Sequence, residues 1–204
     1  MRVGRVELTG SFFLLATWLN YLDRQSVVPL ALLACALHEL GHYWAIRLLG
    51  GDVRLVRLTA IGAEMVLSRP LGYGTEGAAA LAGPGVNLLL ALFFCRWEWG
   101  MLFSGLNLAL GCFNLLPVGR LDGGRALYCT LALLTGPDTA ARVGEWLDRL
   151  FTGGLLAVGL LLLGAGGNLT LLLAALWLAA THVRKNWEKK SAKRACHTGW
   201  KQVK

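Results

Sequence analysis

The sequence predicts an all-α polytopic membrane protein with about six transmembrane helices and a short β-hairpin between the second and third helices. Three observations support this fold class. The 204 residues are 55% hydrophobic and only 16% charged, whereas a soluble domain is about one quarter charged. The mean hydropathy is +0.54, and the apolar residues gather in segments near the ~20 residues that cross a bilayer. We expect one membrane-embedded domain at 1–183 and a basic cytoplasmic tail at 184–204.

Six apolar segments are expected to form the spans, and they lie at about 10–22, 28–49, 76–95, 99–118, 151–165 and 168–183. The first follows a basic N-terminus, as in a signal peptide, but no small-residue cleavage site follows it, so we interpret it as a retained helix. Pro29 suits the start of the second helix and Gly50-Gly51 its end. Because the first and fifth segments are short, the count of six carries an error of one.

Two further elements are expected between the spans. Residues 53–67 are rich in β-branched and aliphatic side chains, are interrupted at Ala60–Ala63 and stop before Pro70. This pattern predicts two short strands in a hairpin, with an irregular interfacial loop as the alternative. After Leu134, a charged stretch containing Trp146 predicts an amphipathic helix at the membrane interface that leads into the fifth span.

The net charge of +8 is explained by membrane topology rather than by nucleic-acid binding. The basic residues lie between the apolar segments and in the tail, without the aromatic interleaving of a nucleic-acid surface. With both termini in the cytoplasm, 18 of the 20 lysines and arginines are cytoplasmic, and only Arg24 and Arg96 lie outside. The positive-inside rule therefore predicts cytoplasmic termini. We interpret the tail as an anchor on anionic lipid, with substrate docking as the alternative.

Cysteine and the isolated histidines point to no second site. The five cysteines contain no C-x-x-C pair, which indicates neither a disulfide framework nor a cysteine zinc site. We expect them to be reduced, buried packing residues. His182 and His197 have no partner at ligand spacing and are expected to be solvated or interfacial.

The stretch ACALHELGHYWAIRLL at 34–49 places two histidines and a glutamate in apolar surroundings. A charge at the bilayer centre costs roughly 2.5–3.5 kcal/mol, and a bound metal would offset that cost. On a helix, His38 and His42 lie one turn apart on one face, the spacing at which two imidazoles hold one zinc ion. Glu39 lies on an adjoining stripe, beside the metal without being a ligand. A solvated helix face, the usual alternative for so short a pattern, does not fit this apolar segment.

Catalytic zinc needs a third protein ligand and an open position. Pro117 and Gly119 should interrupt the fourth helix, and Asp122 follows in a Gly-rich bend. Alone, Asp122 would be an ordinary turn aspartate. With an unmatched H-E-x-x-H in the same chain it becomes the expected third ligand, ahead of Glu64 or Glu76. The predicted topology brings it to the cytoplasmic side, where the histidines also lie, and we expect one zinc per chain.

Together, H-E-L-G-H at 38–42, N-L-L-P at 114–117 and L-D-G at 121–123 resemble the site-2 protease family of intramembrane zinc metalloproteases. Within that family they resemble the branch that contains stage IV sporulation protein FB. The resemblance covers nearly all of the chain up to about residue 183. It implies that the metal ligands are His38, His42 and Asp122. It also implies that Glu39 is the catalytic base and that Asn114 holds the substrate backbone.

The segment AGPGVNLLLA resembles the family's Gly-Pro-x-x-Asn pattern. Its Asn87 is expected either to contact substrate or to form an interhelical hydrogen bond. The family further implies that the hairpin at 53–67 receives substrate as an added strand.

These observations predict an integral-membrane zinc endopeptidase that hydrolyses peptide bonds within or next to a transmembrane segment, in regulated proteolysis. The expected partners are a membrane-tethered protein substrate, the lipid bilayer and membrane regulator proteins, not nucleic acid. The expected location is the bacterial cytoplasmic membrane or a sporulation membrane. The alternative is a metal-binding membrane scaffold or chaperone without proteolytic activity, but such a protein would not need Glu39. A zinc transporter would need several polar sites across the membrane, and the sequence contains one cluster.

Overall fold

The computed structural model describes residues 2–3, 6–23, 27–59, 62–119, 121–165, 172–173, 175–177 and 179–180. The chain divides into two compact units, residues 1–144 and residues 145–204. The first unit contains every candidate site residue. The basic tail, together with His182 and His197, lies outside the described residues, so the interpretation of these segments stays a prediction.

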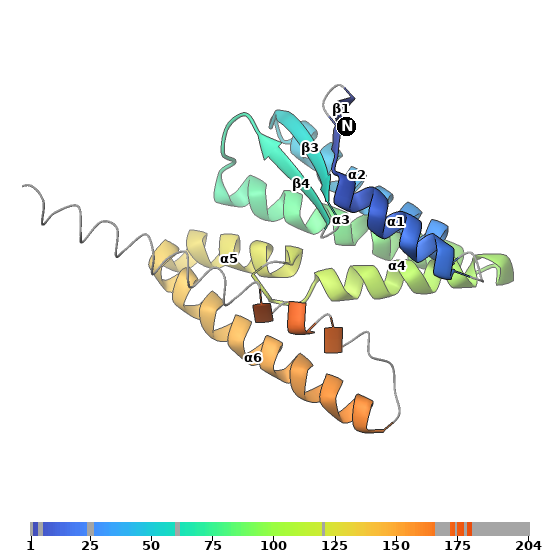
Figure 1. The fold of residues 1–204 in the computed structure, drawn as a ribbon. Coiled ribbons are helices and arrows are strands. Elements are labelled where there is room, and N and C mark those ends of the chain that lie inside the picture. The colour runs from blue at the N-terminus through green and yellow to red at the C-terminus, as the bar shows by residue number, and fades with distance from the viewer. Residues whose placement is uncertain are drawn as a thin grey trace, which may run out of the picture. The chain divides into compact units, whose positions relative to one another are not determined.

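Helices dominate the described residues (Figure 1): α1 (Gly10–Leu22), α2 (Val27–Leu48), α3 (Tyr73–Phe94), the 3-10 helix η1 (Glu98–Gly100), α4 (Met101–Asn114), α5 (Asp122–Thr135) and α6 (Pro137–Gly164). The first three predicted segments are confirmed as helices. The fourth stops early, at Asn114, and α6 contains both the predicted amphipathic helix and the fifth segment. Helix α5 was not among the predicted spans, and the sixth predicted segment falls mostly outside the described residues.

Two of the described helices, Tyr73–Phe94 and Pro137–Gly164, are long and apolar enough to cross a membrane by length and composition. Helices α1, α4 and α5 have only 13 or 14 residues, fewer than the ~20 of a typical span. Helix α2 has 22 residues but also carries two histidines, Glu39 and Arg47, which lower its hydropathy. Six membrane-spanning helices are therefore not confirmed among the described residues.

Helix α2 ends at the glycine pair that the sequence marked as its stop. Gly50 has a φ of +82°, a left-handed conformation that glycine adopts without steric cost. Its N–H donates to the carbonyl of Arg47 at 3.2 Å, and the N–H of Gly51 donates to the carbonyl of Ile46 at 2.8 Å. This pair of bonds is a Schellman motif, which satisfies the last carbonyls of the helix. The chain then enters the sheet two residues later.

The predicted hairpin is confirmed and is part of a larger sheet. Strands β3 (Val53–Thr59) and β4 (Gly62–Leu67) pair antiparallel. Two N-terminal strands, β1 (Arg2–Val3) and β2 (Val6–Leu8), extend the sheet in the order β1-β2-β3-β4, with β2 parallel to β3. Arg57 on β3 links its neighbours, since it lies 3.0 Å from Glu7 of β2 and 3.6 Å from Glu64 of β4. The N-terminal strands were missed because two or three residues are too few to show alternation.

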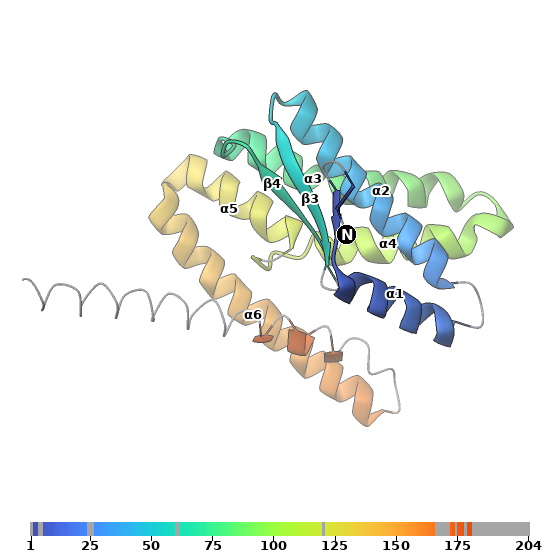
Figure 2. The same ribbon diagram turned by 45° about the horizontal axis from the view of Figure 1, so that its top comes forward.

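Helix α3 is the central element of the first unit and packs against α2, α4 and α5 (Figure 2). The sheet joins this group through a small hydrophobic cluster centred on Ile46 of α2, Val53 of β3 and Ala79 of α3. Small residues on α3 allow its neighbours to approach closely. The residues that α3 buries are mostly small: Gly77, Ala79, Ala80, Gly83, Pro84, Asn87 and Ala91.

One sequence prediction about side-chain burial is wrong. Cys35, Cys95 and Cys112 are free but exposed, and among the described cysteines only Cys129 is buried. The helices that carry the exposed cysteines also expose large apolar side chains, such as Leu89 and Leu92 on α3. An apolar residue type is therefore a poor guide to burial on these outer faces.

Candidate metal centre

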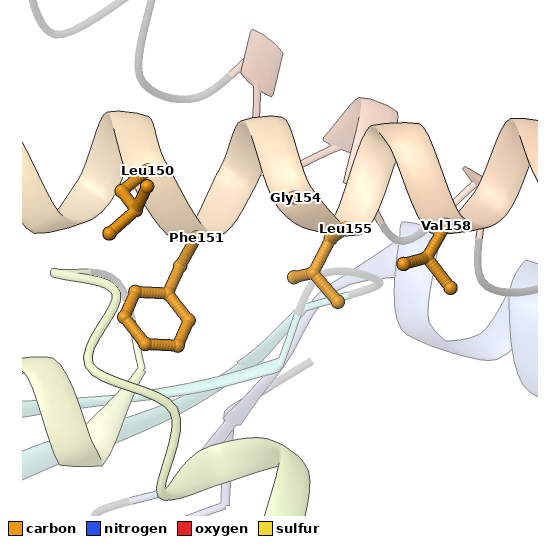
Figure 3. A pocket seen from close by; sticks show the side chains of 5 residues that line it. All are labelled: Leu150, Phe151, Gly154, Leu155 and Val158. Atoms are coloured by element: carbon orange, nitrogen blue, oxygen red, sulfur yellow. The ribbon is translucent and has the colours of Figure 1, made fainter.

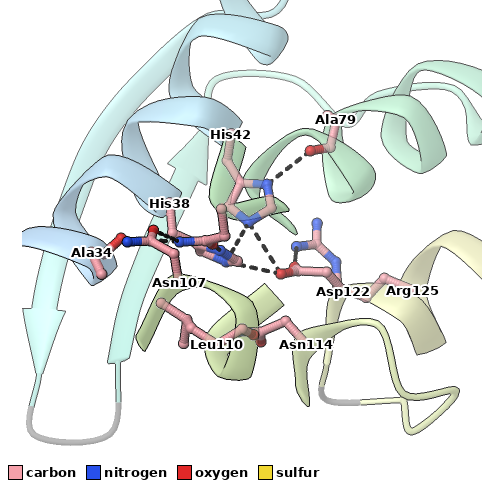
Figure 4. Close-up of polar contacts among 10 residues, drawn as sticks. Ala34, His38, His42, Ala79, Asn107, Leu110, Asn114, Asp122 and Arg125 are labelled. Atoms are coloured by element: carbon pink, nitrogen blue, oxygen red, sulfur yellow. Dashed lines mark hydrogen bonds and ion pairs between the residues drawn. The ribbon is translucent and has the colours of Figure 1, made fainter. Parts of the chain in front are cut away.

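Three buried side chains from two helices converge on one point (Figure 4). His38 and His42 project from α2, and Asp122 is the first residue of α5. The Oδ2 atom of Asp122 lies 3.1 Å from Nε2 of His38 and 3.2 Å from Nε2 of His42, and the two Nε2 atoms are 3.1 Å apart. All three residues are less than one-tenth exposed. They form the one group among the described residues whose donor atoms are arranged to hold a metal ion.

The outer nitrogens of both imidazoles are held by oxygen acceptors. Nδ1 of His42 lies 2.8 Å from the backbone carbonyl oxygen of Ala79, and a carbonyl can only accept a hydrogen bond. Nδ1 of His38 contacts Oδ1 of Asn87. Each Nδ1 therefore carries the proton, and each neutral ring presents an unprotonated Nε2 to the centre. This is the arrangement typical of histidines that ligate a metal.

The donor set fits one zinc ion. With neutral imidazoles, two Nε2 lone pairs and a carboxylate oxygen face one another here, an arrangement that a cation placed among them stabilises. Four ligands placed tetrahedrally at about 2.0–2.1 Å from zinc are about 3.3 Å apart, close to the 3.1–3.2 Å between these donor atoms. Three protein ligands also leave the fourth position open, as catalytic zinc requires.

Gly83 on α3 leaves the space that the centre needs. A Cβ atom at this position would lie 2.3 Å from Nε2 of His42 and 2.9 Å from Cε1 of His38. Cβ atoms essentially never approach other atoms so closely, so a side chain at position 83 would force the imidazoles to shift. The glycine of the Gly-Pro-x-x-Asn pattern is therefore explained by the close approach of α3 to the two imidazoles.

A tightly packed turn positions Asp122. Cβ atoms at Gly123 and Gly124 would each lie 2.1 Å from a backbone carbonyl oxygen, of Leu115 and Val118 respectively. The first turn of α5 therefore rests directly on the backbone that follows α4. With α4 and α5 separated by this turn, the predicted interruption of the fourth helix is confirmed.

The second carboxylate oxygen of Asp122 faces a cation. Its Oδ1 lies 3.8 Å from Nη1 of Arg125, whose Nη2 lies 3.5 Å from Oε1 of Glu76. The two oxygens of Asp122 thus have different surroundings, with Oδ2 toward the imidazoles and Oδ1 toward the guanidinium. This arrangement orients the carboxylate toward the metal position.

The other acidic residues considered from the sequence lie outside the ligand group. Glu39 is half-buried beside His38 and His42, within electrostatic reach of both and of Asp122. Glu64 contacts Arg57 on the sheet, and Glu76 contacts Arg125. Glu39 is thus the carboxylate placed next to the centre without being a ligand.

The two candidate substrate-binding asparagines are engaged within the protein. Asn114 donates from Nδ2 to the carbonyl of Leu110 on its own helix at 3.0 Å. Asn87 is fully buried and contacts His38 and Asn107, so the interhelical hydrogen bond offered as one of its two roles is present. A contact of either residue with substrate stays a prediction.

Three contributors to the centre were missed from the sequence: Gly83, Asn107 and the backbone carbonyl of Ala79. Asn107 did leave a signal, because it interrupts the apolar run SGLNLALG with an amide. The carbonyl of Ala79 left no signal in the sequence, since every residue carries a backbone carbonyl and no residue type marks this one. Gly83 belongs to the Gly-Pro-x-x-Asn pattern of the sequence, but its role depends on the packing of α2 against α3, which that pattern does not record.

One groove in the second unit offers no comparable chemistry. A groove of about 440 Å³ follows α6 and is lined by Leu150, Phe151, Gly154, Leu155 and Val158 (Figure 3). None of these residues has a polar side chain. The groove therefore supplies no ligand, acid or base.

The fold and the site define a class of protein: a helical chain whose H-E-x-x-H helix and a separate aspartate form a zinc centre with an open position. No family model matches the chain. It is 31% identical over 150 residues to a zinc metalloprotease of Methanocaldococcus jannaschii, an alignment that covers 66% of this chain and 44% of that protein. It is also 32% identical over 162 residues to Rip3 of Mycobacterium tuberculosis, covering 70% and 39% of the two chains. The chain thus spans less than half the length of these relatives.

The solved structure of a site-2 protease from Methanocaldococcus jannaschii has the same fold, with a TM-score of 0.66. The two share 23% sequence identity, and the match covers 90% of this chain and 92% of that one. The predicted resemblance is confirmed, and the chain belongs to the site-2 protease family. The narrower resemblance to stage IV sporulation protein FB is not confirmed by these matches.

Proposed function

We propose that this chain is an intramembrane zinc metalloprotease that cleaves peptide bonds within or next to a transmembrane segment of a membrane-tethered protein. One observation carries the proposal. The three donor atoms of His38, His42 and Asp122 converge with an open position, and the carboxylate of Glu39 stands beside them without ligating. A purely structural zinc site is closed by four protein ligands and has no use for a fifth group of this kind.

The residues have distinct roles in the proposed reaction. Zinc held by the three ligands supplies a Lewis acid that activates water and polarises a peptide carbonyl. Glu39 accepts the proton of the attacking water and returns it to the departing amine. A substrate helix must unwind locally, because its backbone groups are otherwise bonded within the helix. The amide of Asn114 is proposed to hold the unwound backbone once it turns from Leu110.

The sheet offers a second contact for an unwound substrate. Within the described part of the chain, β4 pairs on one side only, with β3. An extended peptide can add to such an edge through backbone hydrogen bonds. We propose that substrate enters as a strand along the hairpin and presents its scissile bond to the metal centre.

The proposed environment is a bacterial cytoplasmic membrane, with lipid and membrane regulator proteins as further partners. Two helices meet the length and composition of a span. The outer faces of α3 and α6 also expose leucines that water would penalise, among them Leu89, Leu92 and Leu161. A lipid environment accommodates these side chains, because hydrocarbon is as apolar as leucine.

Replacing Glu39→Gln tests the proposal directly. The amide is nearly isosteric with the carboxylate but cannot accept the proton of the attacking water. We expect zinc content near one per chain and cleavage of a membrane-tethered reporter reduced by about 10²–10⁴. Glu98→Gln, a matched change at an exposed position on η1, outside both the metal centre and the sheet, should leave both quantities at the wild-type level.

The same comparison separates the protease from the alternative, a metal-binding scaffold or chaperone. A scaffold needs zinc and a binding surface, but it does not need a base at position 39. If Glu39→Gln cleaves the reporter as fast as the unchanged chain does, the proposed mechanism is wrong.

A further inference from the structure

We infer that Asn107, on a helix that supplies no metal ligand, is a positioning residue that fixes the tautomer of His38 through Asn87. The inference rests on the metal centre of the proposed function but not on peptide cleavage. If it holds, a residue of α4 influences metal binding although α4 supplies no ligand.

A continuous buried chain of polar contacts supports it. Nδ2 of Asn107 donates to the carbonyl of Phe103 at 2.8 Å, and Oδ1 of Asn107 accepts from Nδ2 of Asn87 at 2.8 Å. Oδ1 of Asn87 in turn contacts Nδ1 of His38. Both asparagines are fully buried, so water does not compete for these groups. This series of contacts runs from α4 through α3 to α2.

The direction of every contact follows from two backbone carbonyls. Phe103 offers only an acceptor, so the amide nitrogen of Asn107 must face it and the amide oxygen must face Asn87. Nδ2 of Asn87 then points to that oxygen and to the carbonyl of Ala34 at 3.4 Å. The oxygen of Asn87 is left for His38, whose Nδ1 must therefore carry the proton. Nε2 is thereby kept unprotonated toward the metal position.

Loss of Asn107 would remove this constraint. Nδ2 of Asn87 would lose its short contact, and the amide could rotate to present a donor to His38. A donor at that place favours the proton on Nε2, which blocks metal binding at that atom. Partners of this kind, beyond the ligands themselves, typically change metal affinity by about 10–100-fold.

The test is zinc affinity of the full chain in detergent, measured by competition with a chelator. Asn107→Leu, which keeps the size but removes the amide, should weaken zinc binding at least tenfold. Asn107→Asp should restore affinity close to wild type, because the neutral carboxylic acid accepts from Asn87 through its carbonyl oxygen and donates to the carbonyl of Phe103 through its hydroxyl. Asp122→Ala gives the value for a centre without its third ligand.

Ser104→Ala is the matched control for a merely structural effect. Ser104 is buried on the same helix and donates to the carbonyl of Ala91 on α3 at 2.8 Å, but this bond does not lead to His38. We expect its zinc affinity to equal that of wild type. The inference is overturned if Asn107→Leu matches Ser104→Ala, or if Asn107→Asp loses as much affinity as Asn107→Leu.

A second measurement applies if the leucine variant does not fold. Nitrogen-15 NMR of histidine-labelled, metal-free wild-type chain reports which ring nitrogen of His38 is protonated. A proton on Nδ1 supports the inference, and a proton on Nε2 overturns it. Neither experiment uses a substrate, so a chain that binds zinc without cleaving would contradict the proposed function and leave this inference standing.

Discussion

At the scale of single residues, Gly83 is the glycine that lies directly against the two imidazoles of the metal centre. Its missing side chain leaves the volume next to Nε2 of His42, where a Cβ atom would approach to 2.3 Å. We expect Gly83→Ala to bind zinc as weakly as Asp122→Ala does, because the methyl group displaces the imidazoles or fills the metal position. Metal analysis of the purified chain measures this loss.

Gly85→Ala is the control for that change. Gly85 lies two residues away on the same helix, and a Cβ atom there would meet no atom within 4 Å. Alanine is also favoured over glycine in a helix by about 1 kcal/mol, so this variant should keep its zinc and its stability. Equal zinc contents in the two alanine variants would show that a side chain at position 83 does not hinder zinc binding.

Residue spacing predicted the ligands better than it predicted their supports. His38 and His42 lie four residues apart on one helix, so local geometry alone places them together. Asp122 could be proposed because an incomplete zinc site requires a third ligand. Asn107 and Gly83 act through contacts between helices, and the sequence does not record which faces of α2, α3 and α4 meet.

At the scale of secondary structure, long elements were more predictable than short ones. Helices α2 and α3 each have 22 residues, long enough for an apolar pattern and clear end signals. Strands β1 and β2 have two and three residues, and their pairing with β3 depends on tertiary contacts. Helix α5 was not predicted as a span because it has only 14 residues, fewer than the ~20 that cross a bilayer, and carries Asp122 and Arg125 near its start.

The corner between α3 and α4 carries an aromatic cluster. Trp97 and Trp99 stack with ring centroids 5.9 Å apart, and Phe93 and Phe94 flank them. Trp99 is 74% exposed, and the cluster directly follows a helix that could span a membrane. Tryptophan prefers the membrane–water interface, because its ring is apolar and its N–H is polar.

We therefore expect this corner to lie at the level of the lipid headgroups. The fluorescence of Trp97 and Trp99 is the difference between the wild-type chain and the variant with both Trp97→Phe and Trp99→Phe. In vesicles with brominated lipids, bromine near the headgroup should quench this difference most. Bromine near the ends of the acyl chains should quench it less. Stronger quenching by the deep bromine would place the corner inside the hydrocarbon and contradict the expectation.

At the scale of the whole molecule, the distribution of charge predicts one orientation in the membrane. Eighteen of the 20 lysines and arginines fall on one side when both termini are cytoplasmic. Retention of basic residues on the cytoplasmic side sets the orientation of membrane proteins. The sheet, with Arg57 and its acidic partners, would then face the cytoplasm, whereas the corner at Glu98 would face outward.

Cysteine labelling tests this orientation in a chain whose five native cysteines are replaced by alanine. Ser68→Cys, in the exposed turn after β4, should react with a membrane-impermeant reagent only after right-side-out vesicles are opened. Glu98→Cys, in the corner between α3 and α4, should react in intact vesicles. The physical reason is the cost of moving the arginines at 47, 54, 57 and 69 to the outer side. If Ser68→Cys reacts in intact vesicles and Glu98→Cys does not, the predicted orientation is inverted, and a substrate would approach the hairpin from the opposite side of the membrane.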